Sequence, residues 1–131
     1  ENIEGITAVH ICFGYAAIIH QRPSGYSFLP ELAGCACQQI SIETAQSKLD
    51  CSVLSSLPAK KIMVGCIDLS DMTVETPQKV VERIKRALQF VKRENVILAP
   101  DCGMKYLPRE VAFGKMQAMA EGAKLLRAEH A

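Results

Sequence analysis

Short apolar runs alternate along the whole chain with segments in which apolar residues recur at helical spacing. The apolar runs predict four β-strands, at residues 6–13, 39–43, 62–69 and 96–99. The third run is almost entirely apolar, which is typical of a strand that is covered on both faces. The intervening and following segments predict helices, at residues 28–38, 47–57, 77–91 and 108–126.

The two later helices have the strongest patterns. Thr76 is suited to cap the helix that begins at Pro77, because its hydroxyl can accept a bond from a free N–H group and proline fits the first turn. The last helix carries Met116 and Met119 within an apolar stripe at helical spacing. We expect this stripe to pack in the core rather than to bind a ligand.

The resulting order, β-α-β-α-β-α-β-α, predicts an α/β fold with parallel strands and right-handed crossovers. The 131 residues suffice for a single domain. Two architectures fit this order: a small open doubly wound sheet, or half of a (β/α)8 barrel. A complete barrel takes about 250 residues, so the chain would supply four of its eight units.

Four potential metal ligands lie at the carboxyl ends of three strands. His10 and Cys12 close the first strand and point to the same face, Glu43 closes the second, and Cys102 follows the fourth. Singly, each has an ordinary explanation: a core histidine and cysteine, a strand-end carboxylate, a turn cysteine. Together at one edge, they predict a tetrahedral zinc site. This edge also holds the active site of (β/α)8 barrels, which favours the half-barrel.

The remaining cysteines do not fit this site. We expect Cys35, Cys37 and Cys51 to lie on helices and Cys66 to lie inside a strand. The chain has long regular segments rather than a small disulfide framework, which predicts reduced thiols and a cytoplasmic location.

Charge and hydropathy exclude other classes of function. The net charge is +1, without the basic excess that nucleic-acid or membrane-surface binding requires. No apolar run approaches the ~20 residues of a membrane span, and the first residues lack the basic start of a secretion signal. The chain enters a strand almost at once, which suggests a fragment, a processed chain or a preceding N-terminal region.

The chain resembles the C-terminal catalytic part of cobalamin-independent methionine synthase over essentially its whole length. The matching motifs are His10-Ile11-Cys12, residues 40–44 (ISIET) and residues 99–105 (APDCGMK), with Arg109-Glu110 opening the last helix. The resemblance implies that residues 1–131 form one C-terminal half-barrel region of a TIM-type catalytic domain.

The resemblance also implies a methyltransferase of methionine biosynthesis. In this family the residues matching His10, Cys12, Glu43 and Cys102 bind a catalytic Zn²⁺, which binds the thiol of homocysteine. The thiol takes a methyl group from a methyltetrahydrofolate and becomes methionine. Physical chemistry agrees, because a metal ion removes the thiol proton at neutral pH and preserves a nucleophile.

Two aspartates are candidate catalytic residues, and one family residue is replaced. We expect Asp68 or Asp101 to accept a hydrogen bond from His10 or from the substrate amino group; a turn aspartate bonding its own backbone is the alternative. Ser70 stands where the family has a histidine thought to shuttle a proton. Another zinc-dependent thiol alkyltransferase, of the epoxide:coenzyme M type, and a non-catalytic zinc-binding half-barrel therefore remain as alternatives.

The half-barrel would leave two unpaired edges. We expect the strands at residues 6–13 and 96–99 to be these edges, with backbone N–H and C=O groups free to pair with another strand. The predicted partner is a missing N-terminal half-barrel or a second copy of the chain, in addition to the small-molecule thiol and the methyl donor.

Overall fold

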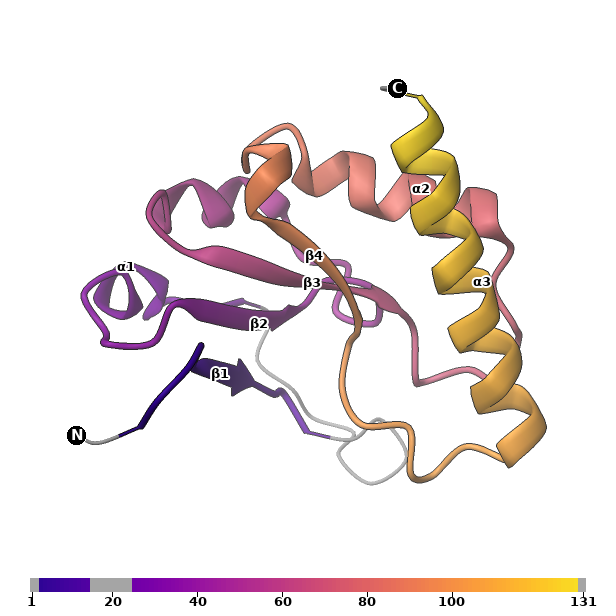
Figure 1. Ribbon diagram of the computed structural model, residues 1–131. Coiled ribbons are helices and arrows are strands. Elements are labelled where there is room, and N and C mark those ends of the chain that lie inside the picture. Colours follow the sequence, from indigo (N-terminus) through magenta and orange to yellow (C-terminus); the bar gives the residue numbers. More distant parts are fainter. Residues whose placement is uncertain (1–2, 15–24, 130–131) are drawn as a thin grey trace.

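The computed structural model describes residues 3–14 and 25–129. Within them, four parallel strands form one sheet in the order β1-β2-β3-β4 (Figure 1). The strands are β1 (Ala8–Ile11), β2 (Gln39–Glu43), β3 (Lys61–Ile67) and β4 (Val96–Pro100). All four predicted strands are confirmed, and so is the placement of the first and last at the two edges.

Helical segments follow each strand. They are α1 (Leu29–Leu32), the 3-10 turns η1 (Cys51–Ser56) and η2 (Arg93–Asn95), and the longer helices α2 (Pro77–Ala87) and α3 (Arg109–Ala128). Helix α2 begins as predicted: the side chain of Thr76 accepts a hydrogen bond of 3.2 Å from the N–H of Lys79. The α/β order of the chain is thereby confirmed.

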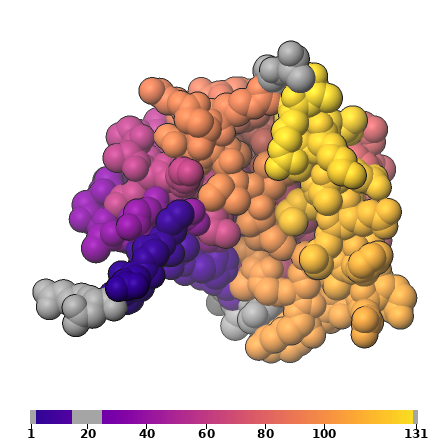
Figure 2. All heavy atoms as spheres, in the orientation of Figure 1, coloured from indigo at the N-terminus to yellow at the C-terminus, as the bar shows by residue number. Residues whose placement is uncertain are grey.

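The two long helices pack against each other beside the central strands, and Figure 1 shows them together at one side of the sheet. Their close approach depends on Gly122, where a Cβ atom would lie 2.7 Å from a methyl of Val80 and 3.1 Å from the carbonyl of Pro77. On the face seen in Figure 2, β1 lies toward one side, and β4 and α3 toward the other.

The predicted helix at residues 28–38 is much shorter in the structure. Helix α1 ends at Leu32, and the turn that follows contains Gly34, a residue that weakens helices. After Gly34 the chain pairs with the first strand, because the Gln38 and Gln39 N–H groups both donate to the Thr7 carbonyl at 3.1 Å. Sheet pairing therefore overrides the helical pattern.

The predicted helix at residues 47–57 is a short 3-10 helix of six residues, η1, which Asp50 caps by accepting from the Ser52 N–H at 3.0 Å. Two serines compete with helical bonding, because the hydroxyls of Ser55 and Ser56 donate to backbone carbonyls three residues earlier, both at 2.7 Å. The short polar side chains account for the difference.

Helix α3 is rotated relative to the predicted stripe. Met119 packs against the core, but Met116 is 53% exposed. The buried positions are Lys115, Ala118, Gly122 and Leu126. A lysine at a buried position breaks the apolar pattern, and its charge is compensated inside the protein, as described below.

Among the helices at residues 25–129, none combines the length and the apolar character that crossing a membrane requires.

Candidate metal centre

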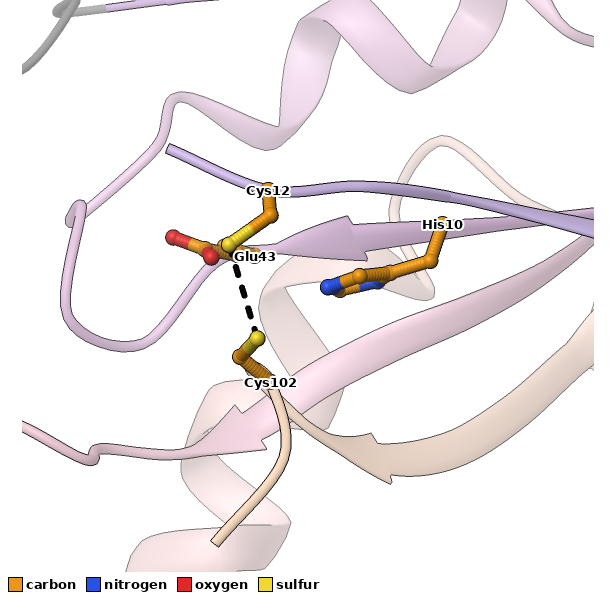
Figure 3. Close-up of side chains that lie close together, drawn as sticks. All are labelled: His10, Cys12, Glu43 and Cys102. Atoms are coloured by element: carbon orange, nitrogen blue, oxygen red, sulfur yellow. Dashed lines mark hydrogen bonds between the residues drawn. The ribbon is translucent and has the colours of Figure 1, made fainter. Parts of the chain in front are cut away.

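Four side chains meet at the carboxyl edge of the sheet. His10 and Cys12 come from β1 and its end, Glu43 closes β2, and Cys102 follows β4 (Figure 3). One ligand atom from each lies within 4.8 Å of the others. Parallel strands bring these residues together because their carboxyl ends share one edge, although Cys12 and Cys102 are 90 positions apart in the chain.

The spacing of the four donors fits a tetrahedral ion. Zinc–thiolate bonds of about 2.3 Å at tetrahedral angles place two sulfurs about 3.8 Å apart. The sulfurs of Cys12 and Cys102 lie 3.4 Å apart, and the dashed line in Figure 3 joins them. Two thiols, one imidazole and one carboxylate form a donor set that suits zinc better than magnesium or calcium, which prefer oxygen ligands.

His10 is oriented by the neighbouring strand. Its Nδ1 lies 2.9 Å from the hydroxyl oxygen of Ser41, the residue paired with it in the β1–β2 register. Such a bond fixes the ring and leaves Nε2 for a metal ion. Neither Asp68 nor Asp101 is among the described contacts of His10, so their expected role toward the substrate stays a prediction.

Glu43 is fully buried and held by neutral donors. Its Oε1 accepts from the backbone N–H of Phe13 at 3.3 Å, and its Oε2 accepts from the Gln46 amide at 2.7 Å. The Tyr26 hydroxyl joins the ends of β1 and β2: it donates to the Ile11 carbonyl at 3.1 Å and accepts from the Glu43 N–H at 3.0 Å. The carboxylate is thus fixed before any ion arrives.

Cys12 is protonated in the absence of metal. Cys12 is an exposed residue, but partial desolvation of its thiol and a hydrogen bond with Glu43 raise the pKa of the thiol to about 12, although the Gly14 N–H, 3.1 Å from the sulfur, acts in the opposite direction. A metal ion must displace this proton, so metal affinity should increase with pH.

Asp101 holds the loop that follows Glu43. Its buried carboxylate accepts from the backbone N–H groups of Thr44 and Ala45, both at 3.1 Å, and of Gln46 at 2.6 Å. Burial, and to a lesser extent nearby Glu43, raise the pKa of Asp101 to about 7 against the effect of these three bonds. Asp101 therefore connects the Cys102 segment to the Glu43 segment.

The carboxylate of Asp101 lies where a side chain of residue 65 would be. A Cβ atom on Gly65 would be 2.2 Å from Asp101 Oδ1 and 2.9 Å from the carbonyl oxygen of Ile42. The close approach of β2, β3 and the β4 end thus requires glycine at this position.

Asp68 lies at the end of β3 and closes its own turn. Its Oδ1 accepts from the backbone N–H of Ser70 at 2.8 Å and from the Ser70 hydroxyl at 2.6 Å. This is the local arrangement given above as the alternative to a catalytic role. It also places Ser70 against a carboxylate.

The loop after β3 is fixed by a buried ionic cluster. Glu75 accepts from Arg83 at 2.8 Å and from Lys115 at 2.9 Å, and Lys115 also donates to the carbonyls of Asp68 and Thr73. Burial raises the pKa of Glu75, but the bonds from Lys115 and Arg83 outweigh this effect and hold it below its usual value.

The sequence did not point to three residues that support the site: Ser41, Gln46 and Tyr26. Ser41 could have been found, because it lies two residues before Glu43 on a strand expected beside His10. Gln46 and Tyr26 carry no comparable signal, since their contacts depend on the paths of loops.

The other cysteines lie away from the four ligands. Cys66 is inside β3 and Cys51 opens η1. The prediction that Cys35 and Cys37 lie on a helix is wrong, because α1 ends at Leu32 and both residues fall in the turn before β2.

Comparisons of the sequence with known proteins all indicate the same family. Residues 19–125 match the family model described as cobalamin-independent synthase, catalytic domain. A methionine synthase of Sulfurisphaera tokodaii is 33% identical over 98% of this chain, and one of Thermococcus kodakarensis is 30% identical over 95% of it. The chain spans only 36% of the length of each.

A solved structure extends the match to three dimensions. The B12-independent methionine synthase from Shewanella sp. W3-18-1, in complex with selenomethionine, aligns with a TM-score of 0.87 and 31% identity. The alignment covers 98% of this chain and 40% of that one. The four βα units are accordingly part of a TIM-type barrel, and the chain belongs to the cobalamin-independent methionine synthase family.

Proposed function

We propose that this chain supplies the zinc-binding part of a thiol methyltransferase that converts homocysteine to methionine with a methyltetrahydrofolate-type donor. The observation that carries the proposal is the meeting of His10, Cys12, Glu43 and Cys102 at the carboxyl edge of the sheet. Membership of a family whose curated relatives are methionine synthases supports the same reaction.

Zinc would supply a positive charge that keeps a bound thiol deprotonated at neutral pH. Cys12 and Cys102 would bind it as thiolates, His10 through the ring nitrogen that faces away from Ser41, and Glu43 through its carboxylate. The protein's part is to hold these donors in place: Ser41 orients His10, and Gln46 and the Phe13 N–H orient Glu43.

The other residues of this edge would position the loops around the substrate. Asp101 fixes residues 44–46 through three backbone bonds, and the cluster around Glu75 fixes the loop after β3. Asp68 remains a candidate partner for the substrate amino group, since a carboxylate can accept more hydrogen bonds than the two from Ser70.

A second candidate is a different zinc-dependent alkyl transfer, such as addition of a thiol to an epoxide. The observation in its favour is Ser70, which replaces the proton-shuttling histidine of the family and donates to Asp68 at 2.6 Å. A serine is a poor proton carrier at neutral pH, so the folate-dependent part of the reaction is the part that this replacement affects.

The rest of the site would come from another half-barrel. β1 and β4 are the sheet edges, and half-exposed apolar residues line β4. The chain spans well under half of its relatives. We infer that residues 1–131 are a C-terminal half-barrel region that closes with an N-terminal half, or else with a second copy of itself.

Zinc analysis tests the metal site directly. Cys102→Ser should lose zinc, while Cys66→Ser, a buried cysteine whose thiol donates to the Ala99 carbonyl at 3.4 Å, should keep it. The opposite result would refute the ligand assignment. Adding homocysteine should then change the X-ray absorption edge of the bound zinc; a closed shell that ignores thiols would indicate the non-catalytic module instead.

Methyl transfer to homocysteine, assayed with a panel of donors, distinguishes the two reactions. Activity with a methyltetrahydrofolate supports methionine formation, whereas activity restricted to epoxides supports the second candidate. For the half-barrel, light scattering on the 131-residue chain is decisive: a zinc-loaded, well-behaved monomer would contradict the need for a partner.

A further inference from the structure

Cys35 and Cys37 form a second pair of close thiols, outside the four-ligand site. Their sulfurs lie 2.9 Å apart. They are in the turn between α1 and β2, just before the strand begins, whereas Glu43 is its last residue, so the two cysteines and the four candidate ligands lie toward opposite ends of β2 (Figure 1). With two ligand atoms only, the pair lacks the closed shell of a structural zinc site.

The backbone of this turn is held by a buried lysine. The ammonium of Lys60 donates to the carbonyl of Cys35 at 2.5 Å and to that of Cys37 at 2.8 Å. The turn is also bonded on both sides: the Cys35 N–H donates to the Leu32 carbonyl, and the Gln38 N–H donates to that of Thr7. The two cysteines are therefore kept close by bonds to the backbone of the turn.

Both thiols are accessible and chemically unequal. Each residue is half-buried and packs against the edge of the core, and Ala36 between them is exposed and small, so the turn itself faces solvent. The hydrogen bond from Cys37 lowers the pKa of Cys35, and the same bond raises the pKa of Cys37. One thiol is thus suited to attack first and the other to react second.

We propose that Cys35 and Cys37 are a redox-active dithiol that forms an intraloop disulfide by exchange with low-molecular-weight disulfides. The closure is short, because a disulfide bond is about 2.05 Å long and the sulfurs are already 2.9 Å apart.

The exchange balances without a further oxidant. The Cys35 thiol gives its proton to solvent, and the thiolate attacks one sulfur of the small disulfide, whose S–S bond breaks and releases one thiolate, which takes up a proton from solvent. Cys37 likewise gives its proton to solvent and attacks the sulfur of Cys35; the mixed S–S bond breaks and releases the second small molecule as a thiolate, which also takes up a proton from solvent. The protein loses two electrons and two protons, and the reagent gains them as two thiols.

The test uses the zinc-saturated chain, so that Cys12 and Cys102 are shielded, with oxidised glutathione as the probe. Cleavage after glutamate isolates residues 32–43, which contain Cys35 and Cys37 and no other cysteine. Mass spectrometry after alkylation should show this peptide unalkylated and about 2 Da lighter, at least about tenfold sooner than any modification of the buried Cys51 or Cys66.

Two variants identify the attacking thiol. Cys37→Ser should accumulate glutathione on Cys35, and Cys35→Ser should react several-fold more slowly at Cys37; equal rates would overturn the assignment of Cys35 as the attacking thiol. Cys51→Ser is the matched control and should leave the rate unchanged. Alkylation of both thiols in residues 32–43 after full exposure to the probe would overturn the proposal, as would protection of that peptide by zinc.

Discussion

Two groups of buried carboxylates lie at the same edge of the sheet, and they differ in what compensates their charge. Glu75, after β3, is bonded to two cations, Arg83 and Lys115. Glu43 and Asp101, at the ends of β2 and β4, are bonded to neutral N–H groups. Both groups are held by several hydrogen bonds, but only the first includes positively charged donors.

The pKa values reflect this difference. The two cations hold the pKa of Glu75 below its usual value in spite of burial, whereas burial raises that of Asp101 to about 7. Two buried carboxylates whose described contacts are neutral N–H groups, beside the accessible thiols of Cys12 and Cys102, are suited to receive a cation from solution. Hydrogen bonding alone therefore does not distinguish a structural cluster from a binding site; the balance of charge does.

The largest expected effect is on the compensated cluster. Glu75→Gln should lower the free energy of unfolding by about 3–5 kcal/mol, because it leaves Arg83 and Lys115 buried without a counter-charge. Urea unfolding measures this loss. The matched control is Glu82→Gln, which removes the exposed pair with Lys79 and should cost no more than about 1 kcal/mol. Equal losses would contradict the assignment of Glu75 as a structural residue.

Stability should also depend on pH through Asp101. Between pH 3.8, its ordinary pKa, and about 7, only the folded state holds the proton. Stability of the chelator-treated chain should therefore fall as pH rises through this window, by up to about 1.4 kcal/mol per pH unit. Urea unfolding across this range should show the slope in the native chain and not in Asp101→Asn.

Bound zinc provides a further check on this pH dependence. A nearby cation favours the ionised form of Asp101, so zinc should flatten the slope of stability against pH. Glu75 acts with the opposite sign: its lowered pKa gives stability that is present above its ordinary value of 4.5 and lost as pH falls below it. A slope that persists unchanged in Asp101→Asn would show that another group causes it.

A smaller loss of stability is expected from a side chain at Gly65, which lies against Asp101. Gly65→Ala should cost about 1–3 kcal/mol, because the added methyl meets the Asp101 carboxylate and the backbone of Ile42, and the backbone cannot easily move. Gly34→Ala is the control, since its nearest contact, the Glu31 carbonyl, is 3.9 Å away. Thermal unfolding of both variants provides the measurement.

The smallest expected change in stability is at the uncompensated site. Glu43→Gln in the chelator-treated chain should change the free energy of unfolding by less than about 1 kcal/mol, because it removes a charge that faces Asp101, its oxygen can still accept from the Phe13 N–H, and its amide can donate to the unbonded amide oxygen of Gln46. The same variant should weaken zinc binding, although less than Cys102→Ser does, since thiolate bonds dominate such a shell. If Glu43→Gln lost as much stability without metal as Glu75→Gln does, the distinction between a binding site and a structural cluster would be wrong.

The sequence was sufficient for the strands and for the meeting of the four candidate ligands, because both follow local rules. Alternation and apolar runs located β2 at its observed bounds, and parallel strand ends brought His10, Cys12, Glu43 and Cys102 to one edge. Metal binding by these residues is still a prediction.

The sequence was insufficient where a distant partner decides the local structure. Helix α1 ends early because the residues that follow it bond to the carbonyl of Thr7. Lys115 can be buried because its ammonium pairs with Glu75, 40 positions away in the chain. The support of Glu43 by Gln46 likewise depends on the path of a loop that Asp101 holds from another strand. None of these contacts has a periodic signal in the chain.

The four-residue strand β1 has a consequence for rates. It lies at the edge of the sheet, bonds to β2, and alternates between exposed and half-buried residues. Short edge strands open at a free energy well below that of global unfolding. Because β1 and its end carry both His10 and Cys12, one such opening withdraws two ligands in a single motion. The rate of opening, measured by amide hydrogen exchange in β1, should therefore match the rate at which a bound ion leaves. Exchange in the buried strand β3 should stay slow both with and without the ion.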